Sequence, residues 1–316
     1  MKLVYRWLSP AGVAARMPVL IFHRVHARPD PLFPGEVDAA RFDQLCGWLR
    51  RWFHVLPLDE AVRLQKQGAL PARAAAITFD DGYADNHDVA MPILQRHGIS
   101  ACFFIASGFL DGGCMWNDRV IEAVRRSKLP SLDLRELSEG LLGVYPLENI
   151  EARRAAIQAI IGKAKYLPVQ KRLDLVDAVL RAAGVALPRD LMMSSEQVRL
   201  MRRGGMQIGA HTLSHPILAG LDAAAATAEI DGSRQQLQGL LDERIGLFAY
   251  PNGKLGSDYS AESVELVRRL GFDAAVSTHP GVFGAKADLF QIPRFTPWES
   301  DKLRFGLRLA QTMARS

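Results

Sequence analysis

Short apolar runs alternate with amphipathic segments along most of this chain. Runs typical of buried strands lie at residues 19–22, 74–79, 101–105, 207–210, 246–250 and 274–277. Segments with apolar residues at helical spacing lie at 42–53, 86–97, 223–241 and 261–270. Strands that are followed by helices predict an α/β fold with parallel strands and crossover helices, closed into a complete or partial barrel.

Residues 112–192 interrupt this alternation. They contain charged amphipathic segments separated by prolines, and no strand-like run is evident among them. We therefore expect a single domain over residues 1–316 that carries a helical insertion at 112–192. The insertion either decorates the barrel or forms a lid over its mouth, and the sequence leaves both readings open.

Composition and charge narrow the class of protein. The chain has 316 residues, 48% of them hydrophobic and 23% charged, which is typical of a globular protein with a sizeable core. The net charge of +5 is dispersed, so nothing motivates nucleic-acid binding, whereas acidic glycans or anionic lipid surfaces would fit. Cys46, Cys102 and Cys114 form no CxxC pair, so we expect reduced thiols and no disulfide framework.

The first residues carry Lys2, Arg6 and Arg16 among apolar side chains. They lack the unbroken apolar core and cleavage site of a secretory signal, and the run at 18–22 is too short to span a bilayer. We therefore expect a cytoplasmic protein, with peripheral membrane contact left open. The oligomeric state is not constrained by the sequence.

Two adjacent carboxylates, Asp80 and Asp81, directly follow the apolar run at 74–79. Gly82 can supply the tight turn that ends the strand. The carboxyl ends of parallel strands are where α/β proteins usually do chemistry. With a cation present, one carboxylate could bind it while the other stays free as a proton acceptor.

Two histidines at the end of a later strand supply further ligands. His211 and His215 are four residues apart, a spacing that can place both imidazoles on one side of a turn. With Asp81 they form a set of two imidazoles and one carboxylate, which leaves metal positions open for water and substrate. Zinc is the default for this set, and Fe, Co or Ni are also suitable. The turn after Tyr250 is either an ordinary connection or a place where the Tyr250 N–H faces a developing oxyanion.

Three motifs in this order resemble those of a known family. They are TFDDG at 78–82, HTLSH at 211–215 and AYPNG at 249–253. Together they resemble the polysaccharide deacetylases with the NodB homology domain, carbohydrate esterase family 4, over residues 18–111 and 193–298. The resemblance implies a distorted (β/α)7 barrel. It also implies a metal-dependent hydrolase of non-peptide amide bonds that removes acetyl groups from N-acetylated sugars.

The resemblance also implies roles for five residues. Asp80 is similar in position to the general base of the family. Asp81, His211 and His215 are similar to its divalent-metal ligands, and Tyr250 to the residue whose backbone amide stabilises the oxyanion. The implied substrate is a glycan of the N-acetylglucosamine type, either a polysaccharide or a lipid-linked precursor.

Two departures from the family pattern shift roles to other residues. The arginine that normally orients the base is replaced by Ala249, and Arg294 is the candidate to take its place. The C-terminal Leu-x-His that supplies the catalytic acid is absent. His23 is the candidate acid, because its segment resembles the N-terminal histidine segment of the subgroup that includes the poly-N-acetylglucosamine deacetylases. His279 is the alternative.

Two other functions remain open at this point. One is an amide hydrolase of the same fold that acts on a small molecule, and the other is a catalytically silent carbohydrate-binding protein. A silent relative is expected to have a damaged first or second motif, and both motifs are complete in this sequence.

Overall fold

The structure is a computed structural model that describes residues 1–315. The chain divides into two compact units. The first, which we call the barrel unit, contains Met1–Arg28, Glu36–Asp111 and the chain from Met193 onward. The second, which we call the inserted unit, contains Pro29–Gly35 and Gly112–Met192.

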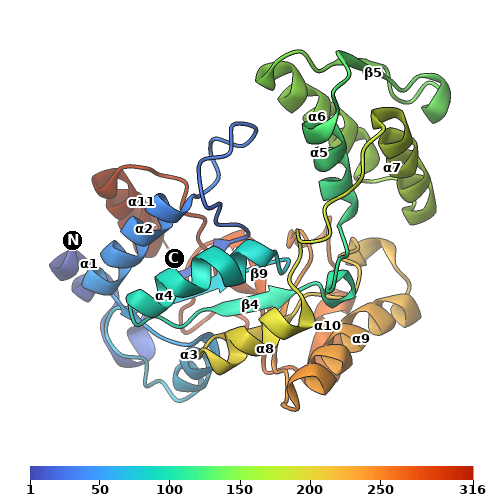
Figure 1. The fold of residues 1–316 in the computed structure, drawn as a ribbon. Coiled ribbons are helices and arrows are strands. Elements are labelled where there is room, and N and C mark those ends of the chain that lie inside the picture. The colour runs from blue at the N-terminus through green and yellow to red at the C-terminus, as the bar shows by residue number, and fades with distance from the viewer. Residues whose placement is uncertain (316) are drawn as a thin grey trace. The chain divides into compact units, whose positions relative to one another are not determined.

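The strands of the barrel unit form one parallel sheet. Along the sheet they are β1 (Val19–Phe22), β3 (Ala74–Phe79), β4 (Cys102–Ile105), β7 (Gln207–Ala210), β8 (Leu247–Ala249), β9 (Ala274–Pro280) and β10 (Ile292–Arg294), while β2 (His54–Val55) pairs with β3 outside this path. The two ends of the path meet, because Ile21 N–H donates to Phe295 O at 3.1 Å and Phe295 N–H to Val19 O at 2.8 Å. The sheet is therefore a nearly closed barrel, as the strand–helix alternation predicted (Figure 1).

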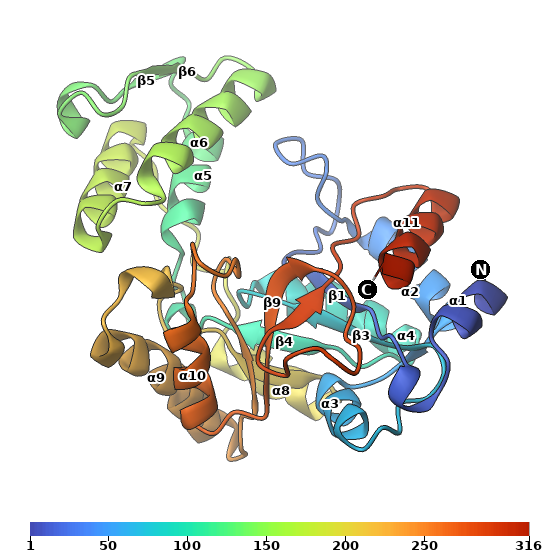
Figure 2. The ribbon, with the colours of Figure 1, turned by 180° about the vertical axis from the view of Figure 1, so that it is seen from behind.

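Helices surround these strands in both views of the barrel unit (Figures 1 and 2). They are α1 (Lys2–Leu8), α2 (Ala39–Trp52), α3 (Leu58–Lys66), α4 (Met91–Arg96), α8 (Ser195–Arg203), α9 (Ala223–Leu241), α10 (Ala261–Arg269) and α11 (Lys302–Arg315). A π-helical turn at Asn86–Ala90 leads into α4, and 3₁₀ turns lie at Gly12–Ala14, Ser107–Phe109 and Leu218–Gly220. Within residues 1–315, no helix has the length and apolar character needed to cross a membrane.

Strand residues alternate between the barrel interior and the layer under the helices. On β3, Ala74 and Ala76 belong to a buried cluster that lines the interior, while Ile77 and Phe79 belong to the larger cluster beneath the helices. The row that starts with Ala74 and Ala76 continues through Thr78 to position 80. A side chain at position 80 therefore lies at the mouth of the barrel on the inward row.

The inserted unit contains three helices and a small hairpin. Its elements are α5 (Trp116–Arg126), β5 (Ser131–Asp133), a 3₁₀ turn (Glu136–Ser138), β6 (Val144–Pro146), α6 (Ile150–Ala164) and α7 (Val169–Ala183). The insertion is mainly helical, as expected, but β5 and β6 also pair as antiparallel strands, which the sequence did not indicate. Each strand has only three residues, too few to produce a readable alternation of apolar and polar positions.

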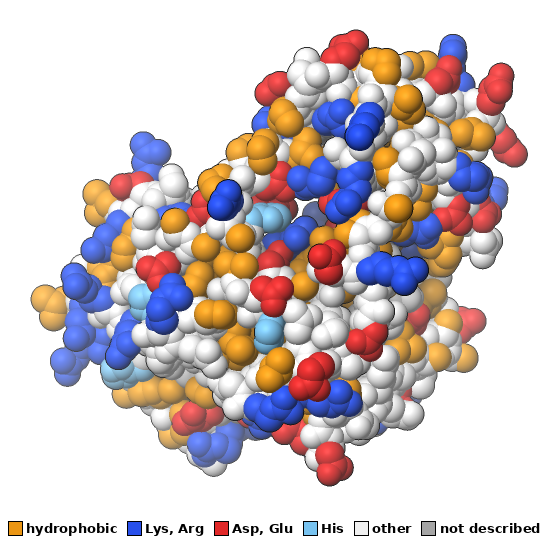
Figure 3. Space-filling view, in the orientation of Figure 1, with side chains coloured by type: hydrophobic (Ala, Val, Ile, Leu, Met, Phe, Trp, Pro, Cys, Tyr) orange, Lys and Arg blue, Asp and Glu red, His pale blue; other side chains and the backbone are white. Residues whose placement is uncertain are grey.

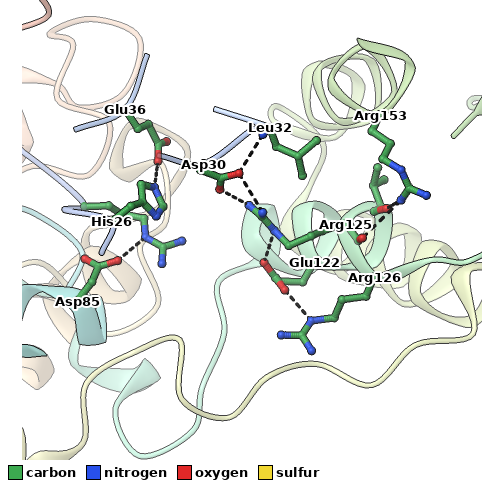
Figure 4. A network of polar contacts seen from close by, with 11 residues as sticks. His26, Asp30, Leu32, Glu36, Asp85, Glu122, Arg125, Arg126 and Arg153 are labelled. Carbon is green, nitrogen blue, oxygen red and sulfur yellow. Dashed lines mark hydrogen bonds and ion pairs between the residues drawn. The ribbon is translucent and has the colours of Figure 1, made fainter. Parts of the chain in front are cut away.

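A short segment from earlier in the chain, Pro29–Gly35, also belongs to the inserted unit (Figure 4). Both carboxylate oxygens of Asp30 accept hydrogen bonds from Arg125, at 3.1 and 2.6 Å. Arg154 donates to Pro31 O at 2.9 Å, and Leu32 is buried in the apolar cluster of this unit. The contact between Asp30 and Arg125 spans 95 residues of sequence, so no local pattern revealed it.

Candidate active site

Asp80 lies at the mouth of the barrel and forms a buried ion pair. Its N–H donates to Phe22 O at 2.9 Å, which continues the pairing of β3 with β1. Its two carboxylate oxygens accept one hydrogen bond each from Arg294, both at 2.7 Å. Asp80 is 2% exposed and Arg294 is 1% exposed, so the pair is shielded from water.

Arg294 is held in place by further contacts. Its Nε donates to Ser277 O at 2.8 Å, and its Nη1 also donates to Thr78 Oγ1 at 3.1 Å. Burial alone would raise the pKa of Asp80, but the charge and hydrogen bonds of Arg294 outweigh burial and hold that pKa below its usual value. Asp80 is therefore an oriented, ionised carboxylate at neutral pH.

Asp81 has an unusual backbone and an unsatisfied oxygen. Its φ of 79° lies in the left-handed region, which non-glycine residues adopt rarely. Its Oδ1 is buried and accepts no hydrogen bond from residues 1–315. The same oxygen lies 3.4 Å from Nε2 of His211 and 3.4 Å from Nε2 of His215.

His211 is oriented by the sheet around it. It follows β7, and its N–H donates to Ile105 O at 3.1 Å. Its Nδ1 lies 2.7 Å from Ala249 O and donates to it, which leaves Nε2 facing Asp81 as the nitrogen that would bind a metal. Gly209, two residues before His211, points to the barrel interior as His211 does. A Cβ at position 209 would lie 2.5 Å from the Phe104 ring. Only glycine fits at this position.

The loop that carries His215 is held by a residue that the sequence did not single out. His215 has a left-handed φ of 53°, and its N–H donates to Thr212 Oγ1 at 3.1 Å. Glu229 accepts hydrogen bonds from Leu213 N–H at 3.0 Å and from Ser214 N–H and Oγ at 2.8 and 2.6 Å. Glu229 lies within α9. A charged residue on a helix is common, so nothing in the sequence marked Glu229 as part of the site.

Asp81, His211 and His215 fit a divalent cation. One ligand atom from each residue lies within 4.8 Å of the others. Two ligands about 2.0–2.1 Å from a tetrahedral ion lie about 3.3–3.4 Å apart, which matches the separation of Asp81 Oδ1 from each imidazole. Burial lowers the pKa of His215 to about 4, so this imidazole is neutral and able to bind a metal at neutral pH. The orphaned Asp81 oxygen is the position a cation would satisfy.

His23 follows β1 at the same edge of the barrel. It directly follows Phe22, which is in register with Phe79, so His23 lies beside Asp80 at the end of the neighbouring strand. Its side chain is exposed, while its backbone O accepts a hydrogen bond from Asn86 Nδ2 at 2.9 Å. The structure thus brings His23, Asp80 and Asp81 to one mouth.

Asp85 fixes the segment that follows His23. It accepts hydrogen bonds from Arg24 Nε at 2.8 Å and from Val25 N–H at 3.2 Å (Figure 4). His279, the alternative acid, lines a cavity of about 490 Å³ together with Lys254.

Tyr250 differs from the sequence-based expectation. Its N–H donates to Val276 O at 3.3 Å, so this amide is engaged in the sheet and does not face a reacting oxyanion. Its side chain is buried and stacks on Tyr259 with ring centroids 4.0 Å apart. Gly253 N–H donates to Pro251 O, and proline has no N–H. Within residues 250–253, Asn252 therefore carries the backbone N–H that has no acceptor in the described chain.

Comparisons with known proteins agree with this architecture. A family model described as polysaccharide deacetylase matches residues 67–129 and 174–275. Among solved structures, the Streptococcus pyogenes deacetylase PplD in complex with acetate is 20% identical, with a TM-score of 0.62, and the match covers 95% of this chain and 98% of that one. IcaB from Ammonifex degensii is 17% identical, with a TM-score of 0.61 and coverage of 96% and 98%.

One curated relative adds to these matches. It is a Bacillus subtilis (strain 168) protein named "Putative polysaccharide deacetylase YxkH", which is 20% identical over 282 residues, or 89% of this chain and 71% of the relative. The solved structures show that the NodB-type barrel is shared, and the family model covers all three motifs. This chain belongs to the polysaccharide deacetylase family.

Proposed function

We propose that this protein is a divalent-metal-dependent N-deacetylase. It hydrolyses the acetamide of N-acetylated sugars of the N-acetylglucosamine type, in a polysaccharide or a glycan precursor, and releases acetate. One observation carries the proposal: Asp81, His211 and His215 gather as a ligand set beside Asp80, a separate carboxylate that Arg294 holds in a fixed orientation.

Asp81, His211 and His215 would hold the metal. A divalent cation bound there supplies a Lewis acid that polarises the acetamide carbonyl and lowers the pKa of a water molecule. Zinc suits two imidazoles and one carboxylate, and Fe, Co or Ni are alternatives.

Asp80 acts as the general base in this proposal. Its pKa is held below its usual value by Arg294, so the carboxylate is ready to accept a proton from the attacking water. The fork of Arg294 engages both oxygens at 2.7 Å and fixes the plane of the carboxylate. Arg294 is therefore the positioning residue for the base. It takes the role of the family's usual arginine, whose position is occupied here by Ala249.

His23 acts as the general acid. An amine is a poor leaving group, so its nitrogen must be protonated as the carbon–nitrogen bond breaks. His23 lies at the mouth beside Asp80, and its side chain is exposed to an incoming sugar. The Asn252 amide replaces that of Tyr250 as the candidate backbone donor to the oxyanion, because the Tyr250 N–H is bonded to Val276.

The proposal is tested by acetate release from oligomers of N-acetylglucosamine. We expect acetate from the wild-type protein, loss of release in chelator, and recovery when zinc is added back. Asp80→Asn should release none, whereas Asp190→Asn, a matched change at an exposed carboxylate of the inserted unit, should behave as wild type. A silent carbohydrate-binding protein would retain the sugars and release no acetate under any of these conditions.

A further inference from the structure

Two helices of the barrel unit direct large apolar side chains into solvent. On α1, Leu3 is 81% exposed and Trp7 is 82% exposed, and their spacing of four residues places them on one face. On α11, Leu303 and Leu307 have the same spacing and are 61% and 49% exposed. Single exposed apolar residues are ordinary, but a group of this kind on adjoining helices marks an interaction site.

The two helices are joined by buried contacts. Tyr5 is fully buried, and its hydroxyl donates to Gly306 O at 2.8 Å. A Cβ at position 306 would lie 2.9 Å from the end of the Met1 side chain, so the two helices approach each other closely at this point. Arg16 also holds the end of α11, because its Nη1 donates a hydrogen bond to Met313 O at 2.9 Å. The exposed side chains are therefore displayed from a fixed platform.

The surrounding charge is positive. Neither α1 nor α11 contains an aspartate or a glutamate, and the exposed cations Arg6 and Arg304 lie among the apolar side chains. The two carboxylates just before α11 are already engaged: Glu299 pairs with Arg308, and Asp301 accepts hydrogen bonds from the amides at the start of α11.

Basic and apolar side chains adjoin one another at the left edge of Figure 3, where α1 lies in Figure 1. We call the following set the α1/α11 patch: Leu3, Arg6, Trp7, Leu303, Arg304 and Leu307.

We propose that the α1/α11 patch docks the protein on a bilayer rich in anionic lipids. Tryptophan and leucine enter the boundary between headgroups and acyl chains, while arginine binds the lipid phosphates. Neither attraction is sufficient alone, and stable association needs apolar burial together with positive charge. The patch supplies both.

A second copy of the chain is a poorer occupant of the same surface. In a symmetric dimer the patch would face itself, which would bring Arg6 and Arg304 close to the same cations of the partner with no carboxylate on either helix to offset them.

The proposal is tested by sedimentation with vesicles of phosphatidylcholine alone and of phosphatidylcholine with phosphatidylglycerol. We expect wild-type protein to bind the anionic vesicles, to bind neutral vesicles much more weakly, and to dissociate as salt rises. The variant Arg6→Gln/Arg304→Gln should bind about 25-fold more weakly, since each of the two cations near an anionic surface contributes about fivefold. The variant Leu3→Ser/Trp7→Ser should bind the anionic vesicles about tenfold more weakly, or weaker still.

Matched controls use the inserted unit. Tyr166→Ser removes an aromatic side chain that is 67% exposed, and Lys128→Gln/Lys171→Gln removes the same charge as the arginine variant from other exposed positions. Both controls should bind vesicles as wild type does. All variants should keep the wild-type unfolding temperature and the wild-type rate of acetate release from soluble oligomers, which separates this inference from the proposed function.

Three outcomes would overturn the proposal. The first is wild-type protein that fails to bind anionic vesicles, and the second is equal loss of binding in the patch variants and their controls. The third is concentration-dependent self-association that Leu3→Ser/Trp7→Ser abolishes, which would assign the patch to a second copy of the chain.

Discussion

Replacing Arg294 with methionine removes the partner that both oxygens of Asp80 share. The methionine fills much of the space of the arginine stem but leaves a carboxylate that is 2% exposed without its counter-charge. Removing one member of a buried ion pair costs about 3–5 kcal/mol of unfolding free energy, because the remaining charge stays desolvated. Arg294→Met should therefore be destabilised by that amount in urea unfolding at neutral pH.

The same change should impair catalysis through the base. A general base contributes roughly 10²–10⁴-fold to the rate, and kcat for acetate release should fall within that range when Asp80 is no longer oriented. Burial raises the pKa of Asp80 and Arg294 offsets it, so without Arg294 that pKa rises. The acidic limb of kcat/KM should then move to higher pH.

Stability should change with pH in a defined direction. Because the folded pKa of Asp80 is lowered, the wild-type pair contributes fully above the unfolded value of about 3.9 and loses its contribution as pH falls through the folded pKa. Arg294→Met has no such pair, so its unfolding free energy should not show this decrease at acidic pH.

Three controls keep the Arg294 prediction specific. Asp80→Asn/Arg294→Met should recover most of the lost stability without recovering activity, since the stranded charge is gone. Arg294→Lys should have a stability and a kcat between those of the wild type and Arg294→Met, because lysine keeps the charge but not the contact with both carboxylate oxygens. Arg203→Met breaks an exposed pair with Glu196 and should cost less than about 1 kcal/mol. An Arg294→Met protein with wild-type stability and a wild-type pH profile would refute the reasoning.

The remaining predictions concern the metal ligands and the acid. His211→Ala should weaken zinc binding by at least about 100-fold, more than the loss of an outer contact, and an unchanged metal content on elemental analysis would remove His211 from the site. His23→Ala should lower kcat with metal content unchanged, whereas the same change at His279 should leave kcat intact; the reverse result would make His279 the acid. Glu229→Gln should weaken zinc affinity by up to about tenfold, measured by competition with a chelator, because the loop before His215 loses its clamp. Wild-type affinity in that variant would show that the loop holds its shape without Glu229.

The sequence predicted those parts of the fold whose patterns are local. The run at 74–79 is entirely apolar apart from Thr78, and β3 has the same bounds. The inward alternation along it also places Asp80 at the mouth. By contrast, β10 is only Ile292-Pro293-Arg294, and a proline within three residues hides a strand because it cannot donate to the ladder.

Long-range pairing limited what the sequence could reveal of the site. Asp80 and Arg294 are 214 residues apart, and Arg294 became a candidate only because Ala249 left a role without a residue. The engagement of the Tyr250 amide with Val276 depends on how β8 pairs with β9, which no motif specifies. Glu229 acts on backbone amides 15 and 16 residues earlier, and amides carry no sequence signal.

The division of labour between Asp81 and Asp80 is tested most directly by zinc titration of the metal-free protein with acetate release followed in the same samples. We expect release by the wild type to rise in step with bound zinc and to reach its maximum at one ion per chain. We expect Asp80→Asn to bind zinc to the same extent and to release no acetate. Release that is already maximal without metal, or turnover by metal-loaded Asp80→Asn, would contradict it.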